Sequence, residues 1–425
     1  MNTKKYLKVE KVLPYKWELI LLLWFTFFNH QGDRQVFNVV LSAIRDDLFL
    51  TDADMGLVAA VLTLAYGILV PIGGFIGDRA NKKWIIIICL MIWSSGTLFT
   101  GMSTLLIHLV ILRGIVTGGG EAFYSPPANA LIAEYHEKTR ATAMSIHQTA
   151  LYAGIIISGF LAGWIADRFG WRMAFYVFGG LGIINVILLL LRLKDSVPAK
   201  KDSGNKAIPK IRFSEGLFVF FKKPTALLLT LAFAGMVFVN VGFMTWMPTY
   251  LFEDFGFSLT RSGFDSTFYH YLAAFFGVLI GARIADHYAS RVTGMRGIVQ
   301  AFGLLLGAPF IFLMGISNTP FVVYICLALF GLFRGIYDSN IFAALYDVIE
   351  PKYRSTATGL MLMFAFVTGA AAPYILGIIK PALGLAWGLS ALSVVYILSA
   401  LSIFIAVRFF YKNDLIKIYN YDTGS

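Results

Sequence analysis

The feature that most constrains this chain is its series of long apolar runs, each long enough to cross a lipid bilayer. A helix that spans the hydrocarbon core needs about 20 apolar residues. Only 14% of the 425 residues are charged and 58% are hydrophobic, whereas soluble domains average roughly a quarter charged residues. The sequence therefore excludes an ordinary soluble enzyme and predicts an all-α polytopic membrane protein.

Twelve transmembrane helices are expected, in two sets of six. The first set is 17–42, 55–77, 84–104, 106–132, 141–166 and 173–193, and the second is 225–251, 262–285, 296–316, 318–346, 355–379 and 383–409. The long polar stretch between the sets contains eight Lys and Arg residues. We therefore expect an N-terminal six-helix half with a short tail (1–193), a basic linker (194–224) and a C-terminal six-helix half with a tail (225–425).

The basic residues predict the orientation of these helices. With the N-terminus inside, 27 Lys and Arg residues fall in inner segments, 5 in outer loops and 3 within spans, which accounts for all 35. Inner loops of membrane proteins are enriched in Lys and Arg, so both termini are expected in the cytoplasm. The N-terminal tail lacks a small-residue cleavage site and is expected to be retained.

The charge and the cysteines exclude other classes of partner. The formal charge of +11 is spread in short clusters between apolar runs, without the basic face that reads nucleic acid. Cys89 and Cys326 lie inside apolar runs and are expected to be reduced packing residues. No metal ligand set, cofactor motif or catalytic residue is expected, and no phosphate-binding loop for ATP occurs.

The two halves share short sequence repeats. Arg113-Gly114-Ile115 in the fourth span matches Arg334-Gly335-Ile336 in the tenth, and KTRATA at 138–143 matches KYRSTA at 352–357. Two six-helix repeats with a binding site at their interface are typical of transporters in which one half rocks against the other.

The stretch that closes the second span carries a family resemblance. Residues 74–83 (GFIGDRANKK) resemble the G-x-x-x-D-R-x-G-R-K loop signature of the major facilitator superfamily, with Asn81 where glycine is usual. The resemblance implies a latch on the outward-open state formed by Gly74, Asp78 and Arg79. Gly74 would allow close helix approach and Asp78 would cap or pair at the helix end. The alternative is a merely solvated run of charges.

Three further stretches resemble the anion:cation symporter family, whose members carry sugar acids and other organic anions. They are 29–34 (NHQGDR), 120–129 (GEAFYSPPAN) and 245–251 (TWMPTYL). Spinster-like lipid transporters share the Asp-Arg pair and a Gly-Glu-Ala-x-Tyr-Ser segment. The tryptophan-proline run in the seventh span and Gly170-Trp171-Arg172 favour the symporter family.

Asp33 and Arg34 are charges near the middle of the first span. A charge at this depth costs at least about 2.5–3.5 kcal/mol and calls for a partner or a function. Consecutive helical residues point about 100° apart, yet one arrangement directs both toward a central cavity, where Arg34 would offer a planar fork of donors to a carboxylate. The resemblance implies that anion-binding role for Arg34 and a titrating role for Asp33. The alternative is a structural ion pair with another helix.

Glu121 is the second buried carboxyl of interest. Arg113 precedes it by eight residues, about 12 Å along the helix axis, so the two cannot touch. An isolated buried carboxyl favours its neutral form and can exchange a proton, and the resemblance links this position to proton coupling. Arg113 has either a coupling role or a packing role with hydrogen bonds to carbonyl groups.

The remaining candidates for substrate binding are polar or aromatic residues within spans: Tyr66, His147, Gln148, Trp246, Arg334 and Asn340. Tyr66 matches a cavity tyrosine of the family. Arg334 and Asp338 share one helix face at i, i+4, so either they form a local ion pair or Arg334 and Asn340 reach substrate. His147 could bind an anion or pack, and Trp246 could stack on a sugar or pack.

The expected function is proton-coupled symport of an organic anion, a sugar acid or similar monocarboxylate, by a monomeric transporter of the inner or plasma membrane. Arg34 would hold the carboxylate, and Asp33 and Glu121 would carry protons. A Spinster-like lysolipid exporter is the alternative, and a non-transporting membrane receptor is the alternative of another class. A membrane enzyme is not favoured because no nucleophile and base occur at workable spacing.

Overall fold

Helices joined by short turns make up the described part of the chain, which contains no strand. The computed structural model describes residues 14–416 apart from 78–79, 137–138, 195–212 and 290. The all-α fold class expected from the apolar runs is confirmed.

The helices follow one another as the hydropathy predicts. The N-terminal half contains α1 (Tyr15–Asp47), α2 (Asp52–Gly77), α3 (Lys82–Thr100), α4 (Leu106–Leu109), the π-helix η1 (Val110–Thr117), α5 (Gly118–Glu121), α6 (Ser125–Tyr135), α7 (Arg140–Phe169) and α8 (Trp171–Arg192). The C-terminal half contains α9 (Phe213–Phe221), α10 (Pro224–Phe255), α11 (Leu259–Ala289), α12 (Met295–Ile316), α13 (Pro320–Asp338), α14 (Ile341–Val348), η2 (Pro351–Tyr353), α15 (Arg354–Gly369), α16 (Ala371–Ile405), η3 (Ala406–Phe410) and α17 (Tyr411–Asp414).

These elements form twelve membrane-length crossings within the described residues. Ten helical segments are long and apolar enough to span a bilayer. The last of them, Pro351–Asp414, contains two crossings because Gly384 bends the chain with a φ of 79°. The more polar α1, which is 33 residues long, supplies the twelfth.

Three crossings are interrupted where uninterrupted spans were expected. The predicted span 106–132 has a turn at residues 122–124, the span 318–346 has one at 339–340, and the span 355–379 has one at residue 370. The first break follows three consecutive glycines and precedes Pro126 and Pro127; glycine is a poor helix former and proline cannot donate a backbone hydrogen bond. In addition, the end of the predicted linker forms the short helix α9.

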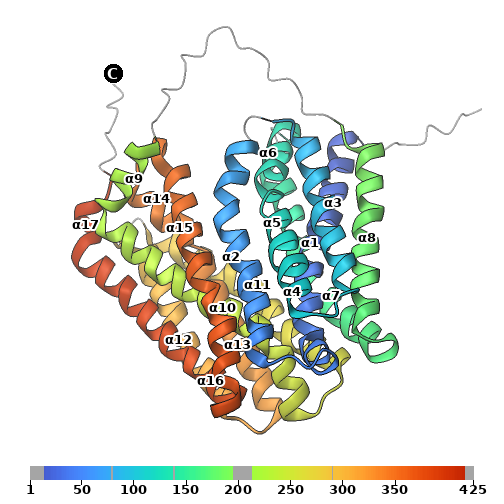
Figure 1. The fold of residues 1–425 in the computed structure, drawn as a ribbon. Helices are drawn as coiled ribbons and strands as arrows, with labels where there is room; N and C mark the ends of the chain where they lie inside the picture. Colours follow the sequence, from blue (N-terminus) through green and yellow to red (C-terminus); the bar gives the residue numbers. More distant parts are fainter. Residues whose placement is uncertain (1–13, 78–79, 137–138, 195–212, 290, 417–425) are drawn as a thin grey trace, which may run out of the picture.

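The two halves pack against each other mainly through α7 with α11 and α2 with α15 and α16 (Figure 1). Close backbone approach at these contacts depends on glycine. A Cβ built on Gly159 would lie 2.5 Å from the carbonyl oxygen of Gly263, and a Cβ built on Gly56 would collide with the carbonyl oxygen of Pro373. The domain boundary at 194–224 stays a prediction, since residues 195–212 lie outside the described part.

The two ends of the molecule differ, and only one of them is closed by contacts between the halves. Tyr15 accepts a hydrogen bond from the Lys194 backbone, and Lys223 donates one to the Asp414 carbonyl; we call the end where these residues lie the terminal end, at the top of Figure 1. At the opposite end, the far end, Asp167 of α7 accepts hydrogen bonds from the backbone of Leu259 and Thr260.

A four-residue ion network also joins the halves at the far end. Arg45 contacts Asp52 and Glu253, each at 2.8 Å, and Lys380 contacts the same two carboxylates, each at 2.7 Å. Among the described residues, every hydrogen bond and ion pair that crosses between the halves lies at this end. The space between the halves is therefore sealed from the far side.

Candidate functional site: a polar cavity between the halves

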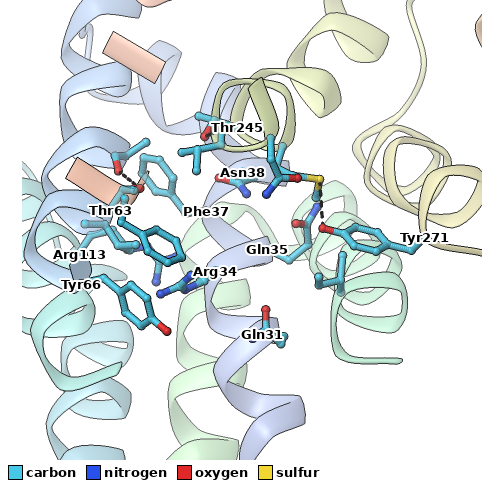
Figure 2. A pocket seen from close by; sticks show the side chains of 17 residues that line it. Gln31, Arg34, Gln35, Phe37, Asn38, Thr63, Tyr66, Arg113, Thr245 and Tyr271 are labelled. Atoms are coloured by element: carbon cyan, nitrogen blue, oxygen red, sulfur yellow. Dashed lines mark hydrogen bonds between the residues drawn. The ribbon is translucent and has the colours of Figure 1, made fainter. Parts of the chain in front are cut away.

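A polar cavity lies in the middle of the molecule between the two halves (Figure 2). It contains about 750 Å³ of space between atoms, part of it open to solvent. The N-terminal half lines it with Gln31, Arg34, Gln35, Phe37, Asn38, Ala59, Leu62, Thr63, Tyr66, Arg113 and Ile155, and the C-terminal half with Asn240, Val241, Met244, Thr245, Tyr271 and Phe366.

Helix α1 presents a polar stripe to this cavity. Gln31, Arg34, Gln35 and Asn38 all line it, and their spacings of three, four and seven residues place them on one helix face. The sequence reasoning selected only Arg34 from this stripe. The helical periodicity of the four residues is the signal that could have identified the other three.

Arg34 is the charged centre of the cavity wall. Its Nε donates to the Glu121 carboxylate at 2.5 Å, and Glu121 has no exposed surface. The Arg34 guanidinium carbon also lies 4.3 Å from the ring centroid of Tyr66, a cation–π contact. Figure 2 shows Arg34 and Tyr66 side by side. Both residues were predicted to bind substrate, and both line the cavity.

The expectation that Glu121 is an isolated carboxyl was wrong. Arg113 does not pair with it, as the helical spacing predicted, but Arg34 reaches it from α1. His30 also lies near the oxygen that Arg34 contacts, with 3.9 Å between His30 Nε2 and Glu121 Oε2. Spacing along one helix cannot reveal a partner that a different helix supplies.

Asp33 does not face the cavity, in contrast to the arrangement that placed both Asp33 and Arg34 there. It is 1% exposed and lies inside the N-terminal half, near Trp93, Thr97 and Arg113. Neither carboxylate oxygen has a hydrogen-bond partner in the described structure. The turn of about 100° between consecutive helical residues separates Asp33 from Arg34.

Arg113 lines the cavity and interacts electrostatically with the buried Asp33. It is only 1% exposed, and its guanidinium carbon lies 5.5 Å from the ring centroid of Phe37. Its Nε and Nη1 have no hydrogen-bond partner among the described residues. Arg113 is thus a cation that can pair with Asp33 or with a ligand in the cavity.

His147 and Gln148 do not line the cavity. His147 is buried, stacks on Phe27 with 4.9 Å between ring centroids, and lies 3.1 Å from the Tyr124 hydroxyl. The neighbouring Gln148 is exposed. The packing alternative therefore describes His147 better than direct substrate contact.

Trp246 and Asn340 are also buried away from the cavity. Trp246 has no exposed surface, and its indole N–H donates to the Pro373 carbonyl at 2.9 Å. Asn340 is 3% exposed and donates to the Ser339 hydroxyl at 2.7 Å. Neither side chain can contact a ligand in the cavity in this state, in contrast to the prediction for both.

Arg334 forms the local ion pair that was one of its two predicted alternatives. Its Nε lies 3.4 Å from the Asp338 carboxylate, and its Nη1 lies 3.0 Å from His270 Nε2. In contrast to its prediction as a substrate-binding residue, Arg334 does not line the cavity in this state; its guanidinium carbon lies 5.8 Å from the ring centroid of Tyr271, which does line it.

The predicted latch falls largely outside the described residues. Asp78 and Arg79 lie there, so their roles stay predictions. Gly74 does not serve close helix packing as expected, because a Cβ built on it would meet no atom within 4 Å. Its neighbour Gly73 does allow close helix packing, since a Cβ built on Gly73 would lie 2.8 Å from the Ala122 carbonyl oxygen.

The C-terminal side of the cavity is the part that sequence reasoning missed. Asn240, Thr245 and Tyr271 supply its polar groups, and Tyr271 contacts the sulfur of Met244 (Figure 2). These residues lie in apolar helices with polar side chains on several faces, so no pattern in a single sequence singles them out.

Comparisons with known proteins show the family. The model of the Major Facilitator Superfamily matches residues 23–373. Protein spinster homolog 1 of Xenopus tropicalis is 27% identical over 383 residues, which cover 85% of this chain and 72% of that protein. The hexuronate transporter of Bacillus subtilis is 26% identical over 380 residues, which cover 86% of this chain and 88% of that protein.

A solved structure shares the fold. The crystal structure of a bacterial homolog to the human lysosomal transporter Spinster, in an inward-facing and unoccupied conformation, superposes with a TM-score of 0.84. It is 22% identical in sequence, and the match covers 96% of this chain and 100% of that one.

Proposed function

The chain belongs to the Major Facilitator Superfamily of membrane transporters, and on this premise we propose that it carries an organic anion, a sugar acid or similar carboxylate, together with protons. Such a protein is a transporter and not an enzyme. The proposal rests chiefly on one observation: Arg34, which lines the central cavity, forms an ion pair with the fully buried carboxylate of Glu121.

The Arg34–Glu121 pair links anion binding to protonation. While Glu121 is ionised, it occupies the Nε donor of Arg34. Protonation removes the negative charge from Glu121, and Arg34 is then free to form charge-assisted hydrogen bonds with a substrate carboxylate. Loss of the proton restores the internal pair and releases the anion. Arg34 Nη2, which has no hydrogen-bond partner in the described structure, is the donor through which a carboxylate can first engage.

Asp33 supplies a second proton-binding group behind the cavity wall. A charge buried in a protein is unfavourable unless it is paired, so the buried Asp33 is a suitable group to bind a proton during transport. Arg113, which lines the cavity and interacts electrostatically with Asp33, can stabilise the ionised form of Asp33 once the proton leaves. Protons that enter with the anion offset its charge against the membrane potential.

The same proposal extends to the orientation in the membrane, the movement of the two halves and the latch. Both termini lie in the cytoplasm, so the terminal end faces inward and the closed far end faces outward, in an inner or plasma membrane. The halves 1–193 and 225–425, joined by the linker 194–224, rock against each other in a functional monomer, and Asp78 and Arg79 latch the opposite state.

Lysolipid export is the second candidate, and similarity to Spinster homologs supports it. The amide-rich wall of the cavity, formed by Gln31, Gln35, Asn38 and Asn240, favours a hydroxylated anion instead, since such a wall offers hydrogen bonds that an alkyl chain would leave unmade.

Ligand binding to the Arg34→Ala variant tests the proposal. The purified protein is titrated with sugar acids, neutral sugars and lysolipids. We expect sugar acids alone to bind, and Arg34→Ala to weaken that binding at least about tenfold, because a hydrogen bond to a charged group contributes about 1.5–3 kcal/mol.

Arg172→Ala is the matched control for this experiment. Arg172 also pairs with a carboxylate of its own half, Asp47, at 2.6 Å, but outside the cavity. Its variant should bind as the wild type does. Normal binding of carboxylates by Arg34→Ala would refute the role of Arg34, and binding of lysolipids alone would favour the second candidate.

A further inference from the structure

His30 of α1 is a buried titratable side chain that the mechanism above does not use. It is 1% exposed and precedes Arg34 by four residues, so the two share one face of the helix. His30 Nε2 lies 3.9 Å from Glu121 Oε2, the oxygen that also accepts a hydrogen bond from Arg34 Nε. His30 thus lies beside the carboxylate on which the proposed coupling depends.

A hydrogen bond from Gln31 determines which nitrogen of His30 carries the proton. The amide nitrogen of Gln31 lies 3.0 Å from His30 Nδ1. An amide nitrogen can only donate, so Nδ1 accepts, and in the neutral ring the proton is on Nε2. Phe27 and Trp93 pack against the ring, with 5.8 and 5.6 Å between ring centroids, and hold its orientation. The nitrogen near Glu121 is therefore an N–H donor.

This donor is not used in the present state. His30 Nε2 has no hydrogen-bond partner among the described residues, and 3.9 Å is too long for an N–H···O hydrogen bond. Glu121 Oε1 also has no partner in the described structure. A buried donor and a buried acceptor that lack partners are both unfavourable, so a movement that joined His30 to the Glu121 carboxyl would be favourable.

Substrate binding would create the need for this donor. In the proposed mechanism, a substrate carboxylate takes the donors of Arg34, and Glu121 carries a proton. The protonated carboxyl of Glu121 can still accept a hydrogen bond, which Arg34 no longer supplies. His30 Nε2 can supply it after a shift of about 1 Å, from 3.9 Å to the usual length of such a bond.

The surroundings of His30 favour a contact with Glu121 over one with another acid. The titratable and charged side chains that face His30 are those of Arg34, Tyr66, Glu121, Tyr124 and His147. Among these, only Glu121 is a carboxylate. Asp33, on the same helix as His30, lies near Arg113 instead.

We propose that His30 is a positioning residue for coupling, which takes over the Glu121 carboxyl from Arg34 when the anion binds. The inference rests on the proposed function and deepens it. Because His30 makes no hydrogen bond to Glu121 in the present state, it stabilises only the state in which Glu121 is protonated and Arg34 is engaged by the anion. His30 thereby raises the pH at which the anion can bind. Gln31, which lines the cavity (Figure 2), keeps His30 in the donating tautomer.

The test measures binding of gluconate and glucuronate against pH, with the full chain in lipid nanodiscs. Phenylalanine removes the donor, so the midpoint of binding in His30→Phe should require an about tenfold higher proton concentration, while binding at low pH should match the wild type. His30→Gln keeps an N–H donor and should restore the midpoint. His136→Phe is the matched control, because His136 is also buried but lies 2.7 Å from the Lys16 carbonyl oxygen; its midpoint should not change.

A second arm separates positioning from packing by introducing His30→Phe into the Glu121→Gln variant. In that variant Arg34 is free with or without the anion, so any contact of His30 with residue 121 is the same in both states. His30→Phe should then change the affinity less than about twofold. An equal loss of affinity at every pH, or in both backgrounds, would assign His30 a packing role and overturn the inference. A midpoint in His30→Gln equal to that in His30→Phe would also overturn it.

Infrared difference spectroscopy tests the contact without any substrate. Acidification should produce a carboxyl C=O band that is absent in Glu121→Gln. A hydrogen bond from His30 lowers the frequency of this band, so we expect a higher frequency in His30→Phe, or in His30→Leu if the former does not fold, and the wild-type frequency in His30→Gln. The same frequency in all of these proteins would overturn the inference. The expected shift in a wild type that binds no sugar acid would refute the proposed substrate alone.

Discussion

Arg34 takes its role from two neighbours that other helices supply, the Glu121 carboxylate and the Tyr66 ring. The carboxylate holds the guanidinium while no anion is present, and the ring lies against its face. The Arg34 guanidinium is then neither unpaired nor permanently paired with Glu121. In the proposed mechanism, coupling at the residue scale is a competition between Glu121 and a substrate carboxylate for the same donors of Arg34.

The Glu121→Gln variant tests this competition. Glutamine resembles the protonated carboxyl in shape and charge, so we expect Arg34 to remain free and substrate to bind with little dependence on pH. Uphill uptake driven by a proton gradient should be lost, whereas exchange of pre-loaded substrate should continue. Both are measured as radiolabelled uptake into vesicles.

A loss of both binding and exchange in Glu121→Gln would instead assign Glu121 a folding role. Thermal unfolding of the same variant provides the control, because loss of the ion pair alone should leave a folded protein.

The outcome for single residues shows how far the sequence could predict the site. Arg34 and Tyr66 were identified by family resemblance, and both line the cavity. Trp246 and Asn340 were expected there and are buried elsewhere, because a polar or aromatic residue in an apolar helix can face the core of its own half as readily as a cavity. Only the packing of neighbouring helices decides between the two, and hydropathy does not contain that information.

At the scale of helices, the sequence predicted positions well and interruptions poorly. A crossing is fixed by the count of apolar residues, so the twelve segments were predictable to within a few residues. The sequence did not predict the turns at residues 122–124, 339–340 and 370, nor helix α9. These features depend on which backbone groups find partners in neighbouring helices, which an apolar run does not specify.

Contacts between helices of opposite halves depend on individual glycines. Gly56 of α2 faces the Pro373 carbonyl of α16, and a Cβ built there would come closer than the 3.0 Å that real Cβ atoms respect. We expect Gly56→Ala to destabilise the far-end contact by about 1–3 kcal/mol, the usual cost of overpacking. Thermal unfolding of the purified protein measures the effect.

Gly180→Ala in α8 is the matched control, because a Cβ built on Gly180 would meet no atom within 4 Å. Alanine favours the helix over glycine, so this variant should be as stable as the wild type or more so. A Gly56→Ala protein as stable as Gly180→Ala would show that the two halves do not pack as closely at α2 and α16 as described.

At the scale of the whole molecule, the far-end ion network holds one conformation. Arg45 and Asp52 belong to the N-terminal half, and Glu253 and Lys380 to the C-terminal half, so each carboxylate is shared by cations of both halves. Opening the far end would separate Arg45 from Glu253 and Lys380 from Asp52. The network therefore contributes to the balance between states rather than to the fold of either half.

Removing a partner from this network should open the far end. In Lys380→Gln, we expect a cysteine introduced into the cavity to react faster with a membrane-impermeant thiol reagent added at the far side. A loss of about 1 kcal/mol would raise the open population about fivefold. Arg172→Gln, which breaks an ion pair within the N-terminal half, should leave the rate unchanged. Equal rates in Lys380→Gln and the wild type would mean that the network does not hold the far end closed.

The measurement that tests the central claim most directly is proton uptake by reconstituted vesicles that contain a pH-sensitive dye, challenged with sugar acids, neutral sugars and lysolipids. We predict acidification on addition of a sugar acid, and its absence in Glu121→Gln. No acidification with any sugar acid, together with transport of lysolipid, would contradict the account.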